Sequence, residues 1–183
     1  MAALPIVKYG SAVLRRKARP VAQVTPELVR LAADMVATMH RAKGVGLAAQ
    51  QVGREESVCV IDVPPECEED DVAREANSII EMPMVMFIPE ILSLDGEQDG
   101  KEGCLSFPGM SAPLKRAYET TVQYIDASGA PRIATVRGFL SRAVQHETDH
   151  LKGILYIDRL EQPARGKIEK KAMAVCRDNG GCE

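Results

Sequence analysis

The sequence predicts an α+β fold that contains a few helices and several short strands. Three observations favour this class. Helical patterns lie near both ends of the chain, over residues 25–44 and about 165–178. Short β-branched or alternating segments fill the middle, separated by turn signals such as Asp95-Gly96. A further helical segment, opened by Gly138 and stopped by Gly153, carries two of the three histidines.

Composition indicates an ordinary globular protein. The 183 residues, 45% of them hydrophobic and 27% charged, suit one domain over residues 1–183. The net charge of −3 and the lack of tryptophan argue against a DNA-binding or general nucleic-acid-binding protein. We expect no secretory signal and no membrane span, because no suitable apolar run is present. Five cysteines without close pairing indicate reduced thiols and a cytoplasmic location.

The first predicted helix has a complete set of boundary signals. Thr25 is a suitable N-cap and Pro26 suits the first helical position. The apolar residues that follow, from Leu28 to Met39, repeat with helical spacing and predict one buried stripe. Gly44 is expected to adopt the left-handed conformation that ends the helix, and His40 is expected to lie at the surface.

The segments after this helix are predicted to be mostly strands. The small residues of 44–53 indicate a close-packed turn whose backbone approaches another part of the protein. Residues 57–63 predict a buried strand, residues 64–83 an acidic surface excursion with a short helix near 72–80, and residues 85–88 a strand that Pro89 ends. Residues 91–94 predict another short strand.

The second half contains a predicted loop, a hairpin and a basic tail. Residues 102–109 form a loop bounded by glycines, and residues 117–125 and 132–137 form a hairpin. Residues 154–157 predict a short strand after the histidine-bearing helix. The tail, residues 163–183, predicts an amphipathic helix ended by Gly180-Gly181, and it carries five basic and one acidic residue between positions 165 and 177.

The histidine-bearing helix contains the pattern His146-Glu147-Thr148-Asp149-His150. Residues four apart lie on the same helix face, so His146 and His150 can bind one divalent metal. Glu147 is then suited to act as a general base on the attacking water. The alternative is that two surface histidines occur on this helix by chance. The pattern requires three specified residues at fixed spacing, which favours a metal site over that alternative.

A catalytic site of this type needs a third protein ligand. The metzincin pattern requires a third histidine at position 156, which is a tyrosine here. A thermolysin-like site requires a downstream glutamate, for which Glu169 is the only reasonable candidate. Cys104 lies in the glycine-bounded loop, where its thiolate could face the histidines, and we prefer it as the third ligand.

Three blocks together resemble the signature motifs of bacterial peptide deformylases. They are residues 44–51 (GVGLAAQQ), residues 102–106 (EGCLS) and residues 145–150 (QHETDH), in the family's order and with similar spacing. The resemblance covers about residues 5–160, the expected catalytic core, and all motif residues are retained. It implies an α+β architecture with mostly antiparallel short strands around the central metal-binding helix, an N-terminal helix and a C-terminal helix.

The resemblance also implies a function and a set of site residues. The enzyme is expected to remove the N-formyl group from N-formylmethionyl nascent peptides and to release formate. Cys104, His146 and His150 would be metal ligands and Glu147 the general base, while Gln51 and the Leu105 N–H would stabilise the oxyanion and Gly46 would pair with the substrate backbone. Gln145 and Asp149 are weaker candidates for orienting the ligands.

The metal implied by the family is Fe²⁺, with Ni²⁺, Co²⁺ or Zn²⁺ also accepted. The basic tail could dock on the ribosome, as in some family members. The alternative enzyme is a zinc endopeptidase with the same histidine motif. The non-enzymatic alternative is a structural metal-binding or partner-binding module.

Overall fold

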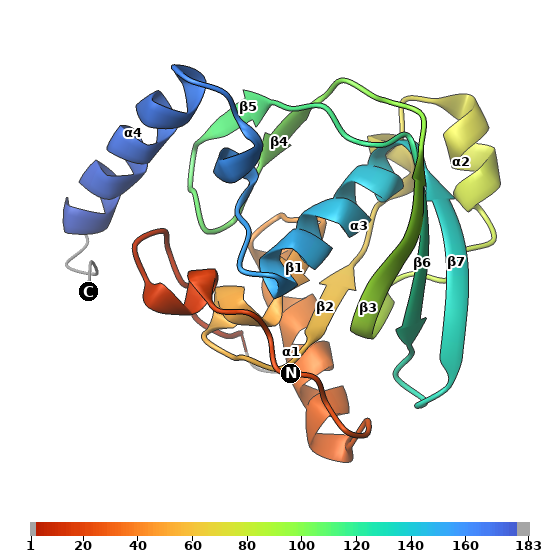
Figure 1. The fold of residues 1–183 in the computed structure, drawn as a ribbon. Helices are drawn as coiled ribbons and strands as arrows, with labels where there is room; N and C mark the ends of the chain where they lie inside the picture. The colour runs from red at the N-terminus through yellow and green to blue at the C-terminus, as the bar shows by residue number, and fades with distance from the viewer. Residues whose placement is uncertain (1–2, 179–183) are drawn as a thin grey trace.

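A computed structural model, which describes residues 3–178, contains one five-stranded antiparallel sheet and one two-stranded sheet (Figure 1). The larger sheet has the order β1-β2-β3-β6-β7 and consists of β1 (Gly46–Ala48), β2 (Val58–Ile61), β3 (Met84–Asp95), β6 (Glu119–Ile125) and β7 (Pro131–Arg137). The smaller sheet pairs β4 (Lys101–Gly103) with β5 (Ser111–Pro113). The four α-helices are α1 (Pro26–Arg41), α2 (Asp71–Asn77), α3 (Gly138–Leu151) and α4 (Ala164–Asp178). This is the predicted α+β class.

Helix α3 lies at the centre of the fold. All of its residues are buried except Phe139, which is half-buried. Strand β2 separates α3 from α1, because alternate residues of a strand point to opposite faces. Cys59 and Ile61 pack in the cluster that contains α3, whereas Val58 and Val60 pack with α1. The unbroken apolar run of β2 therefore reflects burial on both faces. None of the helices within residues 3–178 has the length and apolarity needed to cross a membrane.

Helix α1 begins as predicted and ends differently. The Thr25 hydroxyl accepts a hydrogen bond from the Leu28 N–H at 3.3 Å, and Pro26 occupies the first helical position. The left-handed residue after the helix is Lys43, with φ of 56°, and the prediction of Gly44 for this role was wrong. Gly44 is required for a different reason: a Cβ there would lie 2.7 Å from the Leu105 side chain.

Three predictions of local structure in the strand-rich middle and after α3 were wrong. The segments on either side of Pro89 form one strand, β3, because the pairing with β6 shifts between Phe87 and Glu90 and Pro89 falls in that irregularity. The predicted loop 102–109 begins within β4. Residues 154–157 form no strand and lead into the 3-10 helix η4 (Tyr156–Arg159). Their apolar side chains are buried in a core cluster, and an apolar run of this length does not distinguish a strand from other buried structure.

The acidic excursion contains the 3-10 helix η3 (Pro65–Cys67) and α2, which is shorter than the predicted helix 72–80. Glu68 is buried and accepts a hydrogen bond from the Phe139 N–H at 2.7 Å, at the start of α3. Gly138 has φ of 56°, and a Cβ there would lie 2.7 Å from the Ala73 Cβ. The excursion thus caps α3, and a carboxylate suits the positive end of the helix dipole.

The part of the chain that the structure describes ends with the predicted helix, α4. Ile168, Ala172 and Val175 of α4 belong to the core cluster that includes Leu14 and Phe107. The predicted stop at Gly180-Gly181 lies outside the described residues. The 3-10 helix η1 (Ala12–Arg15) is joined to η4 by an Arg15–Asp158 ion pair.

Candidate metal centre

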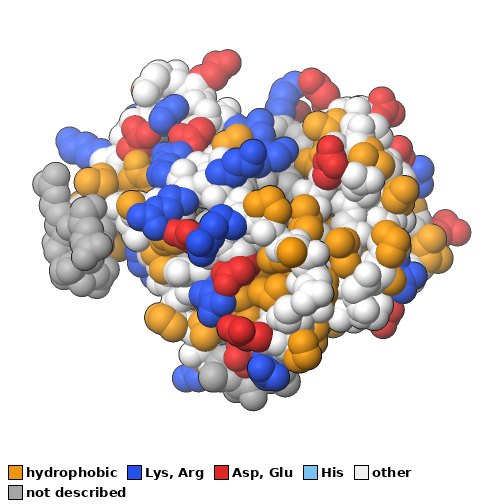
Figure 2. All heavy atoms as spheres, turned by 60° about the horizontal axis from the view of Figure 1, so that its bottom comes forward, with side chains coloured by type: hydrophobic (Ala, Val, Ile, Leu, Met, Phe, Trp, Pro, Cys, Tyr) orange, Lys and Arg blue, Asp and Glu red, His pale blue; other side chains and the backbone are white. Residues whose placement is uncertain are grey.

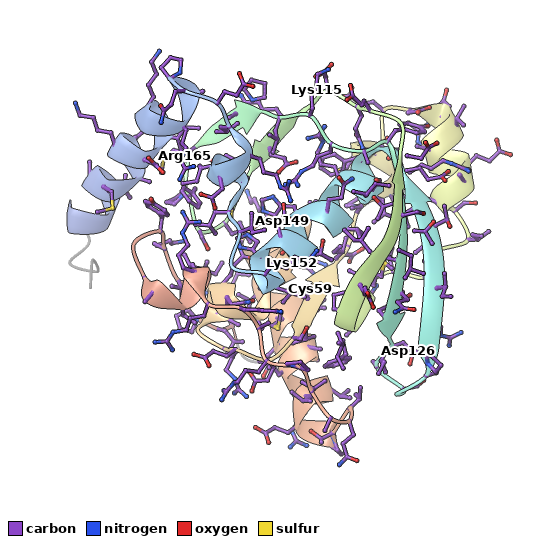
Figure 3. The ribbon with its side chains drawn as sticks, viewed as in Figure 1. Cys59, Lys115, Asp126, Asp149, Lys152 and Arg165 are labelled. Atoms are coloured by element: carbon purple, nitrogen blue, oxygen red, sulfur yellow. The ribbon has the colours of Figure 1, made fainter. Side chains whose placement is uncertain are left out.

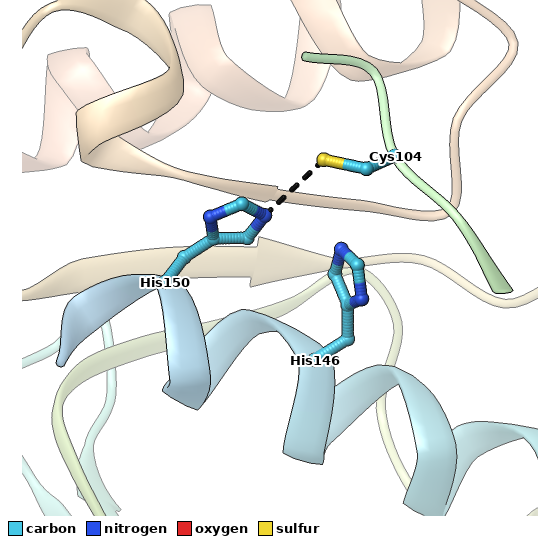
Figure 4. Close-up of side chains that lie close together, drawn as sticks. All are labelled: Cys104, His146 and His150. Carbon is cyan, nitrogen blue, oxygen red and sulfur yellow. Dashed lines mark hydrogen bonds between the residues drawn. The ribbon is translucent and has the colours of Figure 1, made fainter. Parts of the chain in front are cut away.

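His146 and His150 meet Cys104 at the centre of the molecule. One potential ligand atom from each of the three residues lies within 4.8 Å of the others, and both histidines are buried (Figure 4). The Cys104 Sγ and the His150 Nε2 are 3.3 Å apart. Typical metal–sulfur and metal–nitrogen bonds in a tetrahedral site place these two atoms about 3.5 Å apart. One thiol and two imidazoles at this separation fit a single divalent metal with a fourth position open.

The second nitrogen of each imidazole has a different environment. The His146 Nδ1 is 3.0 Å from a carboxylate oxygen of Glu102, so the imidazole donates from Nδ1 and its Nε2 is available to a metal. The His150 Nδ1 is buried and has no hydrogen-bond partner among the described residues. Burial lowers the pKa of His150 well below its usual value, which favours the neutral imidazole that binds metals.

Glu102 joins the cysteine loop to α3. Its carboxylate accepts hydrogen bonds from Arg116 at 2.7 and 3.0 Å and from Arg142 at 2.9 Å, and all three side chains are buried. Burial raises the pKa of Glu102, but the interactions with His146 and Arg116 outweigh it and hold that pKa far below its usual value. Because Glu102 is two residues before Cys104, its contacts with α3 also fix the position of the thiol.

The ion-pair network continues along α3. Arg116 donates to Asp149 at 2.6 Å, and Arg159 donates to both oxygens of the same carboxylate. Figure 3 shows Asp149 extending from α3. Asp149 and Gln145 were expected as weaker candidates for orienting the ligands. Asp149 reaches His146 only through Arg116 and Glu102, and the hydrogen bonds of Gln145 go to Ala117 and Ser141. Both residues instead attach α3 to the segment that contains Arg116.

Glu147 directly follows His146 and is not part of the cysteine–histidine–histidine group that could hold a metal. One of its carboxylate oxygens is buried without a hydrogen-bond partner among the described residues. A Cβ on Gly46 would lie 2.8 Å from the Glu147 Cδ, so the carboxylate is packed directly against the β1 backbone. Burial raises the pKa of Glu147 to about 7, despite the opposing effect of His146. A carboxylate with a free lone pair and this pKa is able to accept and return a proton near neutral pH.

Gln51 is held with its amide directed at the cysteine. Its Oε1 accepts from the Ala48 N–H at 2.8 Å, and its Nε2 lies 3.4 Å from the Cys104 Sγ and 3.4 Å from the Ser106 hydroxyl. The Leu105 carbonyl accepts from the Lys8 ammonium at 2.9 Å. The Leu105 N–H donates to no residue of the described chain. Two N–H donors, from Gln51 and Leu105, therefore flank the thiol.

A cavity of about 250 Å³ opens onto this site. It is bounded by the β1 segment on one side and by β4 and Leu105 on the other. Phe139 and Ala143 contribute apolar surface from α3, next to Glu147. Gly46 of β1 lies opposite Ile61 of β2. The neighbouring pair, Val45 and Asp62, is hydrogen-bonded, because the Asp62 N–H donates to the Val45 carbonyl. Since bonded and non-bonded pairs alternate between antiparallel strands, Gly46 and Ile61 exchange no hydrogen bonds. The Gly46 N–H and C=O therefore point to the free edge of the sheet.

All seven predicted site residues lie at this centre, and two other candidates do not. Glu169 forms an ion pair with Arg165 in α4, and His40 is exposed and bonded to Asp62. The sequence reasoning missed Glu102, Arg116 and Arg142. Glu102 is part of the quoted EGCLS block, so an acceptor for a ligand imidazole could have been sought there. Nothing in the sequence indicates that Arg116 and Arg142 converge on it.

Comparison with known proteins agrees with this geometry. The family model described as Polypeptide deformylase matches residues 3–166. The chain belongs to the polypeptide deformylase family. A peptide deformylase of Opitutus terrae is 42% identical over 95% of this chain and 93% of its own, and one of Nitrosococcus oceani is 41% identical over 94% and 95%. A crystal structure of peptide deformylase from Ehrlichia chaffeensis superposes with a TM-score of 0.88, at 33% identity, over 97% of this chain and 99% of that one.

Family membership establishes the type of enzyme. The chain is a hydrolase of the deformylase type, with metal-dependent removal of the formyl group from nascent peptides as its activity. It contains the cysteine–histidine–histidine group that such an activity needs. No comparison supports the zinc endopeptidase alternative.

Proposed function

We propose that this chain hydrolyses the N-formyl group of peptides that begin with formylmethionine, and that Cys104, His146 and His150 hold the metal. The observation that carries the proposal is the free Glu147 carboxylate oxygen, buried beside a three-ligand group at the end of an open cavity. A divalent metal on these ligands supplies a Lewis acid that polarises a carbonyl and lowers the pKa of a water. The remaining chemistry belongs to the protein's own residues.

Glu147 serves as the general base and then as the general acid. It accepts a proton from the water as the water oxygen bonds to the formyl carbon. The Gln51 amide and the Leu105 N–H donate hydrogen bonds to the oxyanion that develops on the former carbonyl oxygen. Glu147 returns the proton to the amine nitrogen as the C–N bond breaks. The products are formate and a peptide with a free N-terminus.

The substrate backbone lies along the free edge of β1. The Gly46 N–H and C=O pair with it as a neighbouring strand would. The next outward-facing residue of β1 is Ala48, and its N–H is unavailable to a substrate because it is already bonded to the Gln51 side chain. This arrangement supports a substrate with its formyl end near Gln51 and its chain directed back toward Gly44. Phe139 and Ala143 give the same cavity an apolar wall that suits a methionine side chain.

The experiment that tests this function compares the wild-type protein with Glu147→Gln. We expect wild type to release formate from formyl-Met-Ala-Ser. Glu147→Gln should keep its metal but lose about 10²- to 10⁴-fold in kcat, the usual contribution of a positioned acid–base group. Retained turnover in this variant would remove Glu147 from the mechanism. Cys104→Ala is the companion variant, and it should lose the metal itself.

We also propose that the metal is Fe²⁺ and that the enzyme works in the cytoplasm. One thiolate with two imidazoles suits iron and zinc alike, so the choice of iron rests on the family resemblance. Metal analysis after anaerobic purification tests it, and an active preparation that contains zinc and no iron as isolated contradicts it. Cys59, Cys67 and Cys104 are free thiols, which supports a reducing compartment.

Ribosome docking through α4 is a further part of the proposal. Lys167, Lys170 and Lys171 are exposed on this helix, whereas Arg165 is paired with Glu169 and Asp158. Figure 2 shows lysine and arginine side chains over the left half of one face, with aspartate and glutamate side chains among them. Reversal of the three lysines to glutamate should abolish co-sedimentation with ribosomes at about 0.1 M salt. Unchanged co-sedimentation would reject this docking surface.

A further inference from the structure

Two lysines stand at the mouth of the active-site cavity. Lys43 precedes the β1 segment and Lys101 begins β4, and both line the cavity that contains Gly46, Cys104 and Glu147. Both are exposed, and neither ammonium group has an ion-pair or hydrogen-bond partner within residues 3–178. Most other basic side chains near the centre are neutralised, as with Arg116 and Arg142. Two free positive charges therefore face the entrance.

The positions of the lysines match the path of a bound peptide. Lys43 is three residues before Gly46, and Lys101 is three residues before Cys104. Lys101 and Cys104 are joined by the extended β4 segment, so at about 3.3 Å per residue their backbones lie roughly 10 Å apart. Lys43 lies in the turn before β1, with φ of 56°, and is therefore nearer to Gly46 than an extended segment would place it. A peptide paired with the edge of β1 would place the residues after its methionine between these two side chains.

The other charges that line the cavity do not offset the lysines. Glu102 is buried and paired with Arg116, Arg142 and His146. Glu147 lies at the reacting end of the cavity, packed against Gly46. The nearby Asp62 is bonded to His40, which offsets its charge only when the imidazole is protonated. Asp99 lies two residues before Lys101, and both Asp99 and Glu97 interact with Lys115. Among the side chains that line the cavity itself, the two exposed charges are therefore those of Lys43 and Lys101.

Resting on the proposed function, we propose that Lys43 and Lys101 give this enzyme a preference for formylmethionyl peptides with acidic residues in the three positions after the methionine. Each exposed lysine–carboxylate pair is expected to raise kcat/KM by about two- to fivefold, the range of exposed ion pairs. The gain should appear in KM, because the lysines are remote from the reacting bond. It should nearly disappear at 1 M salt, where charges are screened beyond about 3 Å.

The test uses three formyl peptides with amidated C-termini and the metal-loaded enzyme. Formyl-Met-Ser-Asp-Asp, formyl-Met-Ser-Ser-Ser and formyl-Met-Ser-Lys-Lys have the same length and differ only in the last two residues, which are acidic, neutral or basic. Formate release gives kcat and KM for each, and the loss of the ranking at 1 M salt separates the effect of charge from that of side-chain size. Wild type should rank them acidic, neutral, basic. Lys43→Glu and Lys101→Glu should each weaken this order, and the double variant should reverse it. Lys17→Glu is the matched control, since Lys17 is exposed and lies outside the cavity lining.

The outcomes separate this inference from the proposed function. Equal kcat/KM for the three peptides, or a preference for the basic one, overturns the role of the lysines while deformylase activity stands. An equal effect of Lys17→Glu shows that net charge alone is responsible, and likewise overturns it. Failure to release formate even from the neutral peptide overturns the proposed function itself. Metal content measured on every variant confirms that the substitutions leave the centre loaded.

Discussion

Glu102→Gln tests whether the buried ion pairs behind the metal ligands hold the site together. The substitution keeps the side-chain volume but removes the charge that neutralises Arg116 and Arg142. The side chains of Glu102, Arg116 and Arg142 are 4%, 3% and 4% exposed, so solvent screens these ion pairs only weakly. Removal of one partner from a buried ion pair typically destabilises a protein by about 3–5 kcal/mol. For a chain of this length, that corresponds to a fall in Tm of roughly 6–20 °C.

The same substitution should weaken metal binding. The Glu102 carboxylate accepts the hydrogen bond of the His146 Nδ1, and loss of such an outer partner typically lowers metal affinity about 10- to 100-fold. Two assays measure the two effects. Urea unfolding in the presence of EDTA gives the free energy of the metal-free fold. Competition with a chelator of known affinity gives the metal dissociation constant.

Glu97→Gln is the control for Glu102→Gln. Glu97 pairs with Lys115 at 3.1 Å, and both side chains are mostly exposed. Its loss should change the unfolding free energy by less than about 1 kcal/mol and leave metal affinity unchanged. The reasoning is refuted if Glu102→Gln unfolds within about 1 kcal/mol of wild type and binds metal equally well.

Three further changes test other parts of the site. Gly46→Ala should lower kcat/KM at least tenfold in the formate assay, because the new Cβ overlaps the Glu147 carboxylate; wild-type rates would show that β1 can move aside. Glu68→Ala should destabilise the fold by about 1–2 kcal/mol in urea unfolding, since it removes the carboxylate that caps α3. Thr25→Ala should destabilise it by about 1 kcal/mol without changing kcat, and reduced activity would link α1 to the site unexpectedly.

The sequence was sufficient to predict that Cys104, His146 and His150 come together in a group that could hold a metal, because such chemistry needs fixed residue types. The spacing of His146 and His150 follows from one turn of helix, and the cysteine was identified through its motif. Helix α1 was predictable for a similar local reason, since Thr25 and Pro26 mark its start. These features depend on residues close together in the chain.

Features that depend on distant contacts were not predictable. The 3-10 conformation at Tyr156 is favoured by burial against Phe107, 49 residues earlier, with ring centroids 5.1 Å apart. Gly44 is required by its contact with the distant Leu105, and the left-handed residue of the turn is Lys43 instead. The capping of α3 by Glu68 joins residues 71 apart in sequence. The acidic excursion therefore looked like a surface loop, although one of its carboxylates is structural.

The most direct test of the central claim is metal analysis of anaerobically purified protein alongside formate release from formyl-Met-Ala-Ser. We predict about one divalent metal per chain in wild type, formate release proportional to that metal, and loss of both in Cys104→Ala. Full metal content and activity in Cys104→Ala would contradict the assignment of the thiolate as the third ligand. Metal-loaded wild type that releases no formate would contradict the assigned function.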